Sequence, residues 1–204
     1  MTTHVPEDAT ARLLLDGEAM ARSLSRIAHE IVERNGGPTG PGLEQVALVG
    51  IQSRGAPLAS RLRRLVEERS GVALPVGALD ITFHRDDVHV RDGGRARGRQ
   101  PVVRATSIAF SIEGLTVVLV DDVLYTGRTI RAAIDALLEF GRPARVQLAV
   151  LVDRGHRELP IRPDYVGKNL PTGREERIQV ELVEVDERDG VFLVEGREDG
   201  APGV

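Results

Sequence analysis

The sequence has no cysteine and no tryptophan, and only two tyrosines and four phenylalanines among its 204 residues. Without cysteine, it cannot form disulfides, zinc–thiolate sites or iron–sulfur clusters, or use a cysteine nucleophile. Long apolar runs are also missing: none exceeds about seven residues, whereas a helix needs ~20 to cross a bilayer. The opening residues, MTTHVPEDATAR, carry no apolar segment behind a basic start. We therefore expect no secretory signal, no membrane partner and a cytoplasmic protein.

Lysine is almost absent as well. Lys168 is the only one, so arginine supplies 26 of the 27 basic residues. They are balanced by 31 acidic residues, and a net charge of −4 with a pI near 5.8 argues against a nucleic-acid surface that covers the whole chain. The excess of arginine fits either a compositional bias or local forks that bind phosphate groups in bidentate fashion. Local clusters must decide between these two interpretations.

The order of apolar runs predicts one α/β domain. With 41% hydrophobic and 28% charged residues, the composition is that of a globular chain. We predict helices at 16–34, with Asp16 as the N-cap, at 56–69 and at 128–140. Buried strands are predicted at 46–51, 75–83, 117–120 and 146–152, with shorter candidates at 164–167, 178–185 and 191–194. Continuous apolar strands that alternate with amphipathic helices favour a mostly parallel sheet flanked by helices.

Three segments fall outside this pattern. Residues 84–104 have many charges and almost no apolar periodicity, and so long a loop is either disordered or a functional lid; we favour a flexible lid. Residues 1–12 and 196–204 are predicted to be disordered tails. The domain would then span 13–195, with a small C-terminal hood formed mainly by 153–195.

The most informative stretch is VVLVDDVLYTGRT, residues 117–129. Its strand ends in Asp121 and Asp122, which places two carboxylates at the carboxyl edge of a parallel sheet, where open α/β sheets bind ligands. The residues that follow form a turn that opens a helix, and backbone N–H groups in such a turn cradle phosphate. Carboxylates that accept bonds from a diol, next to N–H groups that donate to a phosphate, suit a sugar phosphate as ligand. One of the two carboxylates is also suited to helping hold Mg²⁺. A plain capping role is the alternative for an isolated pair of aspartates.

A second loop has the same placement. Residues 50–55, GIQSRG, follow the first buried strand and precede a helix, so they reach the same edge of the sheet. Gly50 and Gly55 alone would fit an ordinary turn. Motifs for other nucleotide folds are missing, since the chain has neither G-x-x-x-x-G-K-[ST] nor G-x-G-x-x-G after a strand. These absences argue against a P-loop NTPase and a Rossmann dehydrogenase.

The residues 117–129 resemble the phosphoribosyl-pyrophosphate (PRPP) signature of type I phosphoribosyltransferases. Together with four further strings, of which the block RGHRELPIR-x-DYVGKN is far the most selective, they resemble the PyrR family, whose members regulate pyrimidine operons by binding mRNA and are uracil phosphoribosyltransferases. These strings are SRIAHE (25–30), DITFHRDD (80–87), VDRGHRELPIR (152–162) and DYVGKN (164–169). The resemblance runs from about residue 13 to 195. It departs in the lid, in the tails and at Gly173, where we would expect a serine.

The resemblance implies a type I phosphoribosyltransferase fold and a set of site residues. Asp121 and Asp122 would take the ribose hydroxyls, directly or through a Mg²⁺ that comes with PRPP. Ser53, Arg54 and Arg104 would bind pyrophosphate, and Arg154 with the backbone near Ile178 would frame the uracil. The 5′-phosphate would lie on Val123, Leu124, Tyr125, Thr126, Gly127, Arg128 and Thr129. The implied reaction is uracil plus PRPP to UMP plus diphosphate, with the lid excluding water.

Two basic clusters are interpreted as an RNA surface because of the same resemblance. Arg22, Arg26 and His29 lie opposite the apolar stripe of the first helix, and five basic groups follow within fifteen residues from Arg154. The implied RNA-binding residues are Arg22, Ser25, Arg26, His29, His156, Arg157, Arg162 and Lys168. From the residues alone, a solvated helix face and local ion pairs with Asp153, Glu158 and Asp164 remain equally open. Few aromatics argue against base stacking, so a structured stem-loop is the more natural partner.

The expected function is control of pyrimidine genes by UMP- or UTP-dependent binding of leader mRNA, through transcriptional attenuation or translational repression, together with uracil phosphoribosyltransferase activity. We also expect a homodimer or higher homo-oligomer, and no DNA partner. The main alternative is an enzyme of pyrimidine salvage without RNA binding. A regulator without turnover, and a transferase for hypoxanthine, guanine or orotate, stay open as well.

Overall fold

The computed structural model describes residues 11–37, 42–82, 84 and 105–194. Most of the expected lid, Arg104 and nearly all of the two expected tails lie outside the described residues. In the described part, no helix is long and apolar enough to span a bilayer.

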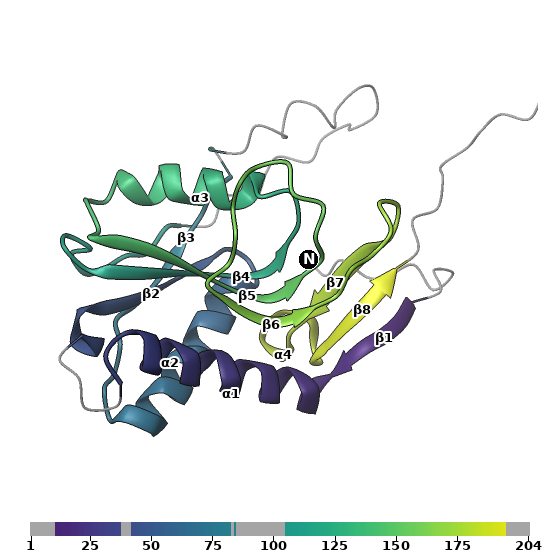
Figure 1. Cartoon of the computed structure of the whole chain (residues 1–204), viewed down its shortest axis with the longest axis horizontal. Helices are drawn as coiled ribbons and strands as arrows, with labels where there is room; N and C mark the ends of the chain where they lie inside the picture. Colours follow the sequence, from purple (N-terminus) through teal and green to yellow (C-terminus); the bar gives the residue numbers. More distant parts are fainter. Residues whose placement is uncertain (1–10, 38–41, 83, 85–104, 195–204) are drawn as a thin grey trace, which may run out of the picture.

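A five-stranded parallel sheet forms the centre of the molecule, with the strand order β3-β2-β4-β5-β6 (Figure 1). Its strands are β2 (Val46–Ile51), β3 (Val76–Leu79), β4 (Thr116–Leu124), β5 (Arg145–Asp153) and β6 (Tyr165–Asn169). Every residue of β2 is buried, as a strand covered on both faces requires. The expectation of an α/β fold with a parallel sheet is confirmed.

Helices cover both faces of this sheet. They are α1 (Gly17–Arg34), α2 (Gly55–Ser70) and α3 (Arg128–Leu138), and a short 3₁₀ helix (Leu43–Gln45) precedes β2. α1 and α2 lie side by side below the sheet and α3 lies above it (Figure 1). Asp16 caps α1 as predicted, because its carboxylate accepts a 2.8 Å bond from the Ala19 N–H. Both ends of each predicted helix lie within two residues of the ends of the corresponding observed helix.

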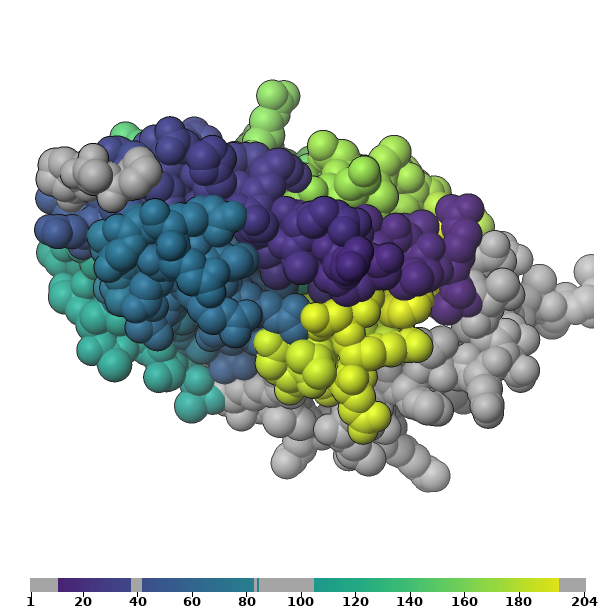
Figure 2. All heavy atoms as spheres, turned by 90° about the horizontal axis from the view of Figure 1, so that it is seen from below, coloured from purple at the N-terminus to yellow at the C-terminus, as the bar shows by residue number. Residues whose placement is uncertain are grey.

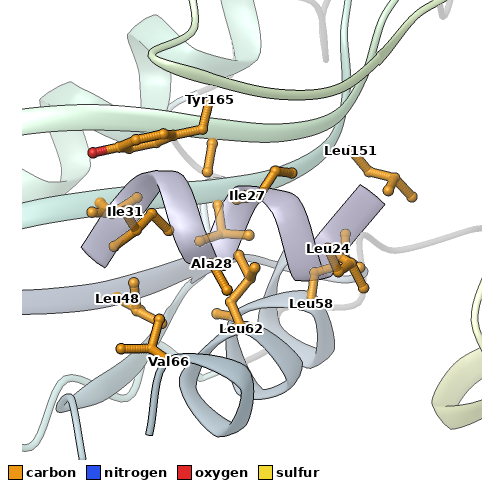
Figure 3. Packing of buried hydrophobic residues seen from close by; sticks show 14 of the residues in the cluster. Leu24, Ile27, Ala28, Ile31, Leu48, Leu58, Leu62, Val66, Leu151 and Tyr165 are labelled. Carbon is orange, nitrogen blue, oxygen red and sulfur yellow. The ribbon is translucent and has the colours of Figure 1, made fainter. Parts of the chain in front are cut away.

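One apolar stripe fixes α1 on the sheet. Figure 3 shows Leu24, Ile27 and Ile31 of α1 between the sheet and the facing side of α2, and all three are buried. Burying a side chain of this size stabilises the fold by roughly 1.5–3 kcal/mol relative to leaving it in water. The opposite face of α1, with Arg22, Arg26 and His29, stays at the surface.

A smaller antiparallel sheet, which we call the hood, completes the molecule. Its order is β1-β8-β7, with β1 (Ala11–Asp16), β7 (Arg177–Glu181), β8 (Gly190–Val194) and the short helix α4 (Val183–Asp186) between the last two strands. The prediction of a tail up to residue 12 was wrong at Ala11 and Arg12, which pair with Val194 and Leu193. The strand predicted at 178–185 ends at Glu181, because the Val185 and Asp186 N–H groups bond to the Leu182 carbonyl and turn the chain.

Two further strand boundaries differ from prediction. The strand predicted at 75–83 is limited to Val76–Leu79, where it pairs with β2. The strand predicted at 117–120 extends through both aspartates to Leu124, because β5 continues beside it and pairs Asp121 with Val150 and Leu124 with Asp153. The two carboxylates are therefore carried by a rigid strand rather than by the loop after it.

Candidate functional site

Three adjacent strands deliver the predicted site residues to one edge of the parallel sheet. β2, β4 and β5 are neighbours in the sheet, and their carboxyl ends lead into Ser53 and Arg54, into Asp121–Thr129, and into Arg154. Two of the three hood strands, β7 and β8, follow β6 in sequence, whereas β1 precedes the parallel sheet. The three segments predicted to contact a phosphorylated sugar and a base thus meet at the edge where such sheets bind ligands.

The two aspartates occupy different surroundings on β4. Asp121 is buried, and its Oδ1 accepts a 3.0 Å bond from the Asp122 N–H. The Asp122 carboxylate accepts a 2.8 Å bond from the Val123 N–H. Burial raises the pKa of Asp122 above its ordinary value, and the positive charge of Arg54 acts in the opposite direction. A hydroxyl donor or a cation that binds the Asp122 carboxylate would therefore stabilise its charged form.

The loop from Tyr125 to Gly127 has the shape expected of a phosphate cradle. Gly127 has φ +94° and is the N-cap of α3, which it cannot cap with a side chain, and the Arg128 N–H donates a long 3.4 Å bond to Thr126 Oγ1. The segment after β5 supports the loop, because the Thr126 carbonyl accepts bonds from the N–H groups of Glu158 (3.0 Å) and Leu159 (3.1 Å). The geometry suits an anion held by backbone N–H groups.

The loop after β2 packs tightly against β4. A Cβ on Gly55 would lie 2.2 Å from the Val120 carbonyl oxygen, so only glycine permits this approach. A cis peptide bond joins Gln52 and Ser53, and Arg54 then opens α2. The Arg54 guanidinium is mostly buried and pairs with Asp186 of the hood at 2.7 Å. Sequence analysis missed this partner, because nothing in the local pattern joins α4 to the start of α2.

Arg154 is a buried support of the site. Its guanidinium donates to Thr172 Oγ1 (3.0 Å) and to the carbonyls of Gly173 (3.0 Å) and Glu176 (2.8 Å), and its Cζ lies 4.0 Å from the Tyr125 ring centroid. It therefore ties the loop between β6 and β7 to the phosphate cradle. Ile178 is the second residue of β7 and is partly buried against the core.

Gly173 takes part in this support through its backbone alone. Its N–H donates to Glu176 Oε2 at 2.6 Å and its carbonyl accepts from Arg154. A Cβ at this position would make only an ordinary 3.4 Å contact with Glu176. The serine that the resemblance led us to expect would therefore fit, and the structure gives no reason why glycine stands here.

Among the basic residues of α1, Arg26 contacts the edge strand β6. Its guanidinium donates to Glu30 (2.7 Å) and to the carbonyls of Val166 (2.8 Å) and Gly167 (2.6 Å). A polar hollow of about 450 Å³ lies here, lined by Arg26, Glu30, Asp164 and residues 166–169. Arg22 pairs with Glu18 at 3.1 Å, and Ser25 accepts a bond from Arg69 of α2, which sequence analysis missed.

The second predicted basic cluster divides between two places. His156 bonds to the Thr172 carbonyl (2.6 Å) and packs edge-on to Tyr125, close to the phosphate cradle. Arg157 donates to Asp153 (2.6 Å) and to the carbonyls of Tyr125 and Ile161, as the ion-pair alternative required. Lys168 is exposed on β6 near α1, and Arg162 is exposed just before that strand. The structure therefore groups Lys168 with α1 and places His156 and Arg157 beside the cradle.

The residues present could hold a magnesium ion only together with ligands from a bound substrate. Among the described residues, no three His, Asp or Glu side chains gather closely enough to hold a metal ion. Asp121 and Asp122 can supply one or two carboxylates, and Mg²⁺ commonly takes its other ligands from substrate phosphates and water.

Comparisons with known proteins agree with this geometry. The model of the phosphoribosyl transferase domain family matches residues 11–188. Among solved structures, a hypoxanthine phosphoribosyltransferase from Trypanosoma cruzi has a TM-score of 0.65 at 18% identity, covering 91% of this chain and 97% of that one. A hypoxanthine phosphoribosyltransferase from Staphylococcus aureus has a TM-score of 0.64 at 18% identity, covering 98% and 99% of the two chains. At such identities, these structures establish the fold alone.

Curated relatives are far more similar. A bifunctional protein PyrR from Roseiflexus is 62% identical over 89% of this chain and 93% of its own length. A bifunctional protein PyrR from Halalkalibacterium halodurans is 52% identical over 90% and 97% of the two chains. Each match leaves only about a tenth of this chain uncovered. The chain therefore belongs to the PyrR family, within the wider family of phosphoribosyl transferase domains.

Proposed function

We propose that this chain transfers a phosphoribosyl group from PRPP to uracil, and that the same chain regulates pyrimidine biosynthesis genes by binding leader mRNA when uridine nucleotides are bound. One observation carries the proposal: close PyrR similarity extends over nearly all of the chain, including the strands and loops that form the site. Regulation would act by transcriptional attenuation or by translational repression.

The reaction exchanges one bond at C1 of the ribose. N1 of uracil bonds to C1 as the C1–O bond to diphosphate breaks, and the N1 proton passes to the leaving diphosphate or to water, so that UMP and diphosphate leave. Asp121 and Asp122 would accept from the ribose hydroxyls, and the loop from Val123 to Thr129 would hold the 5′-phosphate through its N–H groups. Ser53 and Arg54 would hold the diphosphate, with Arg104 proposed to add charge from outside the described residues.

Charge develops at two points during this exchange. The ribose ring becomes positive, and the carboxylates of β4 lie on the strand that ends beside it. The leaving diphosphate gains negative charge, and a guanidinium fixed at that point stabilises it without reorganising. A magnesium ion bound with PRPP would neutralise phosphate charge, and Asp121 and Asp122 would be its protein contacts. Arg154 would act on the uracil side by holding residues 172–176 and Tyr125 in place, beside the Ile178 backbone.

The RNA partner would lie on the surface formed by α1 and β6. This surface presents Arg22, Ser25, Arg26, His29 and Lys168, with Arg162 beyond its edge. Arginine forks recognise phosphates in bidentate fashion, and a local patch can do so although the chain as a whole is acidic. UMP or UTP would favour RNA binding and PRPP would oppose it, since the nucleotides share one site that is coupled to this surface. Assembly into a homodimer or higher homo-oligomer is part of the proposal.

Two assays test the proposal. The first offers the protein PRPP with Mg²⁺ and uracil, hypoxanthine, guanine or orotate, and we expect nucleotide formation with uracil alone. The Arg54→Ala variant should lose roughly 100-fold in turnover while UMP still binds, because only the diphosphate contact is removed. Equal turnover would remove Arg54 from the diphosphate site.

The second assay measures binding to the pyrimidine-operon leader RNA at fixed salt, with UMP, with PRPP and with neither. We expect tight binding that UMP strengthens and PRPP weakens. Transfer to uracil without any specific RNA affinity would instead establish the alternative, an enzyme of pyrimidine salvage alone. The ion pairs of Arg22 with Glu18 and of Arg26 with Glu30 favour that alternative, because they neutralise part of the basic surface.

A further inference from the structure

The joint between the diphosphate loop and the hood is an arginine–carboxylate fork. Arg54 Nε donates to Asp186 Oδ2 at 3.1 Å, and Arg54 Nη2 donates to Asp186 Oδ1 at 2.7 Å. The two side chains are 23% and 9% exposed, so water competes poorly with the pair. Bidentate pairs of this kind fix the plane of the guanidinium as well as its position.

This fork occupies only one edge of the guanidinium. An arginine carries five N–H donors in a rigid plane, and Asp186 uses the edge made by Nε and Nη2. Among the described residues, Asp186 is the only hydrogen-bond partner of this guanidinium. The edge made by Nη1 and Nη2 therefore stays available for a second bidentate acceptor, which diphosphate oxygens provide.

Asp186 is itself held in place from two sides. Its Oδ2 also accepts a 3.1 Å bond from the Leu182 N–H, which fixes it within α4. Nearby, Arg61 of α2 binds Glu184 (2.5 Å) and Asp189 (2.7 Å), so the α4 segment is fastened to α2. Figure 2 shows this part of the hood lying against α2. The orientation of Arg54 is therefore set by a rigid neighbour rather than by its own flexible stem.

The guanidinium also lies within electrostatic reach of the reacting end of the site. Its positive charge acts on Asp122 at the end of β4, while Asp186 lies on the hood side. Arg54 thus stands between a hood carboxylate and the ribose-binding carboxylates. A group held in this way loses little conformational freedom when a ligand arrives, which improves affinity.

We propose that Asp186 is a positioning residue for phosphoribosyl transfer: it holds the Arg54 guanidinium side-on, so that the free edge meets the diphosphate of PRPP. The proposal rests on the proposed function, in which Arg54 binds that diphosphate. It adds a hood residue to the reaction, and it assigns to α4 a role in presenting the diphosphate loop.

The test compares Asp186→Asn with Glu184→Gln, its matched control. Both changes remove one carboxylate of α4 that pairs with an arginine, but only Asp186 pairs with Arg54. Calorimetry would measure binding of magnesium pyrophosphate and, separately, of UMP, which has no diphosphate. For Asp186→Asn we expect pyrophosphate affinity to fall roughly 10-fold and UMP affinity to stay within about twofold, since only the guanidinium is misplaced. Glu184→Gln should leave both affinities within about twofold of the parent.

Pyrophosphate binding by a third variant, Arg54→Lys, distinguishes failure of the positioning role of Asp186 from failure of the diphosphate role of Arg54. Lysine cannot make the fork, so in its background Asp186→Asn should have no further effect on pyrophosphate binding. Weak binding by Arg54→Lys with normal binding by Asp186→Asn would overturn the positioning role alone. Normal binding by both would overturn the diphosphate role of Arg54, and the positioning role with it. An equal loss of UMP and pyrophosphate affinity in Asp186→Asn would mean that the residue only stabilises the hood.

Discussion

At the scale of single residues, Asp122 is a proposed site residue whose burial lowers the stability of the folded protein at neutral pH. Burial raises the pKa of its carboxyl group above the ordinary value of 3.8, although the positive charge of Arg54 acts in the opposite direction. The folded state therefore disfavours the ionised form. The contribution of Asp122 to stability is greatest below pH 3.8 and is lost as the pH rises through the raised pKa of the folded state. At neutral pH, this aspartate opposes folding.

We predict that Asp122→Asn raises the melting temperature of the ligand-free protein at pH 7 and lowers transferase activity strongly. The amide keeps an oxygen for the Val123 N–H but carries no charge to be buried. Thermal unfolding at pH 7 and at about pH 4 would measure the gain, at roughly 2–4 °C for each kcal/mol in a chain of this size. The gain should shrink at the lower pH. The exposed Asp135→Asn serves as control, and a melting temperature that Asp122→Asn leaves unchanged or lowers would contradict the prediction.

Residue positions were predictable from sequence where the motif is contiguous. Asp121, Asp122 and the loop to Thr129 were placed correctly at one sheet edge, because strand, turn and helix follow one another in sequence. The partners of Arg54, Arg154 and Arg157 were not predictable, except that Asp153 had been named as an ion-pair alternative for Arg157. The side chains that Arg54 and Arg154 contact lie elsewhere in the sequence, in the hood and the loop leading to it. Local patterns carry no information on such contacts.

At the scale of elements, α1 has a structural role on one face and a proposed RNA-binding role on the opposite face. Its apolar stripe packs on the sheet, and Arg26 at the margin donates to two carbonyls of the edge strand β6. Arg26 therefore fastens the helix to β6 while facing the proposed RNA surface. Arg22, in contrast, contacts only Glu18 of the same helix among the described residues.

This difference predicts distinct outcomes for two substitutions. Arg22→Ala should weaken leader-RNA affinity, reduce the slope of log K against log[salt] by about 0.9 for each lost phosphate contact and leave stability unchanged. Arg26→Ala should weaken RNA binding and also lower stability, because two carbonyls of β6 lose their donor. Filter binding across a salt series, with urea unfolding of the same samples, would measure both effects. Unchanged RNA affinity in both variants would remove α1 from the interface.

Element boundaries were predicted best where a residue within the element sets them. Asp16 caps α1 as predicted, and Gly71 ends α2 in the left-handed conformation that glycine adopts without strain. The end of β4 and the presence of β1 were misjudged because strands far away in sequence set them. β5 carries β4 through the aspartates, and pairing with β8 turns Ala11 and Arg12 into a strand.

At the scale of the whole molecule, Arg61 is the main ionic link between the hood and the body. It binds Glu184 and Asp189 together, and its charge lowers the pKa of both carboxyl groups. Their contribution to stability is therefore present above their ordinary values of 4.5 and 3.8, and it is lost as the pH falls through the lowered values of the folded state.

We predict that Arg61→Gln lowers the free energy of unfolding by about 2 kcal/mol at pH 7, because two partly buried carboxylates lose their partner. The deficit should shrink as the pH drops below 4, where those carboxyl groups take up protons. Urea unfolding at several pH values would measure this. Arg63→Gln, which removes an exposed pair with Glu67, should change stability by less than about 0.5 kcal/mol. A deficit independent of pH would contradict the ionic account.

The pairing of β1 with β8 has a consequence for how the protein is made. β1 is an edge strand whose only partner in the hood sheet is β8, and most of the chain lies between them in sequence. During synthesis, residues 11–16 leave the ribosome long before residues 190–194 exist. The parallel sheet and its helices can form while translation continues, whereas β1 can pair only after β8 has been synthesised. The hood, and with it the carboxylate proposed to orient Arg54, can therefore assemble only after the parallel sheet has been synthesised.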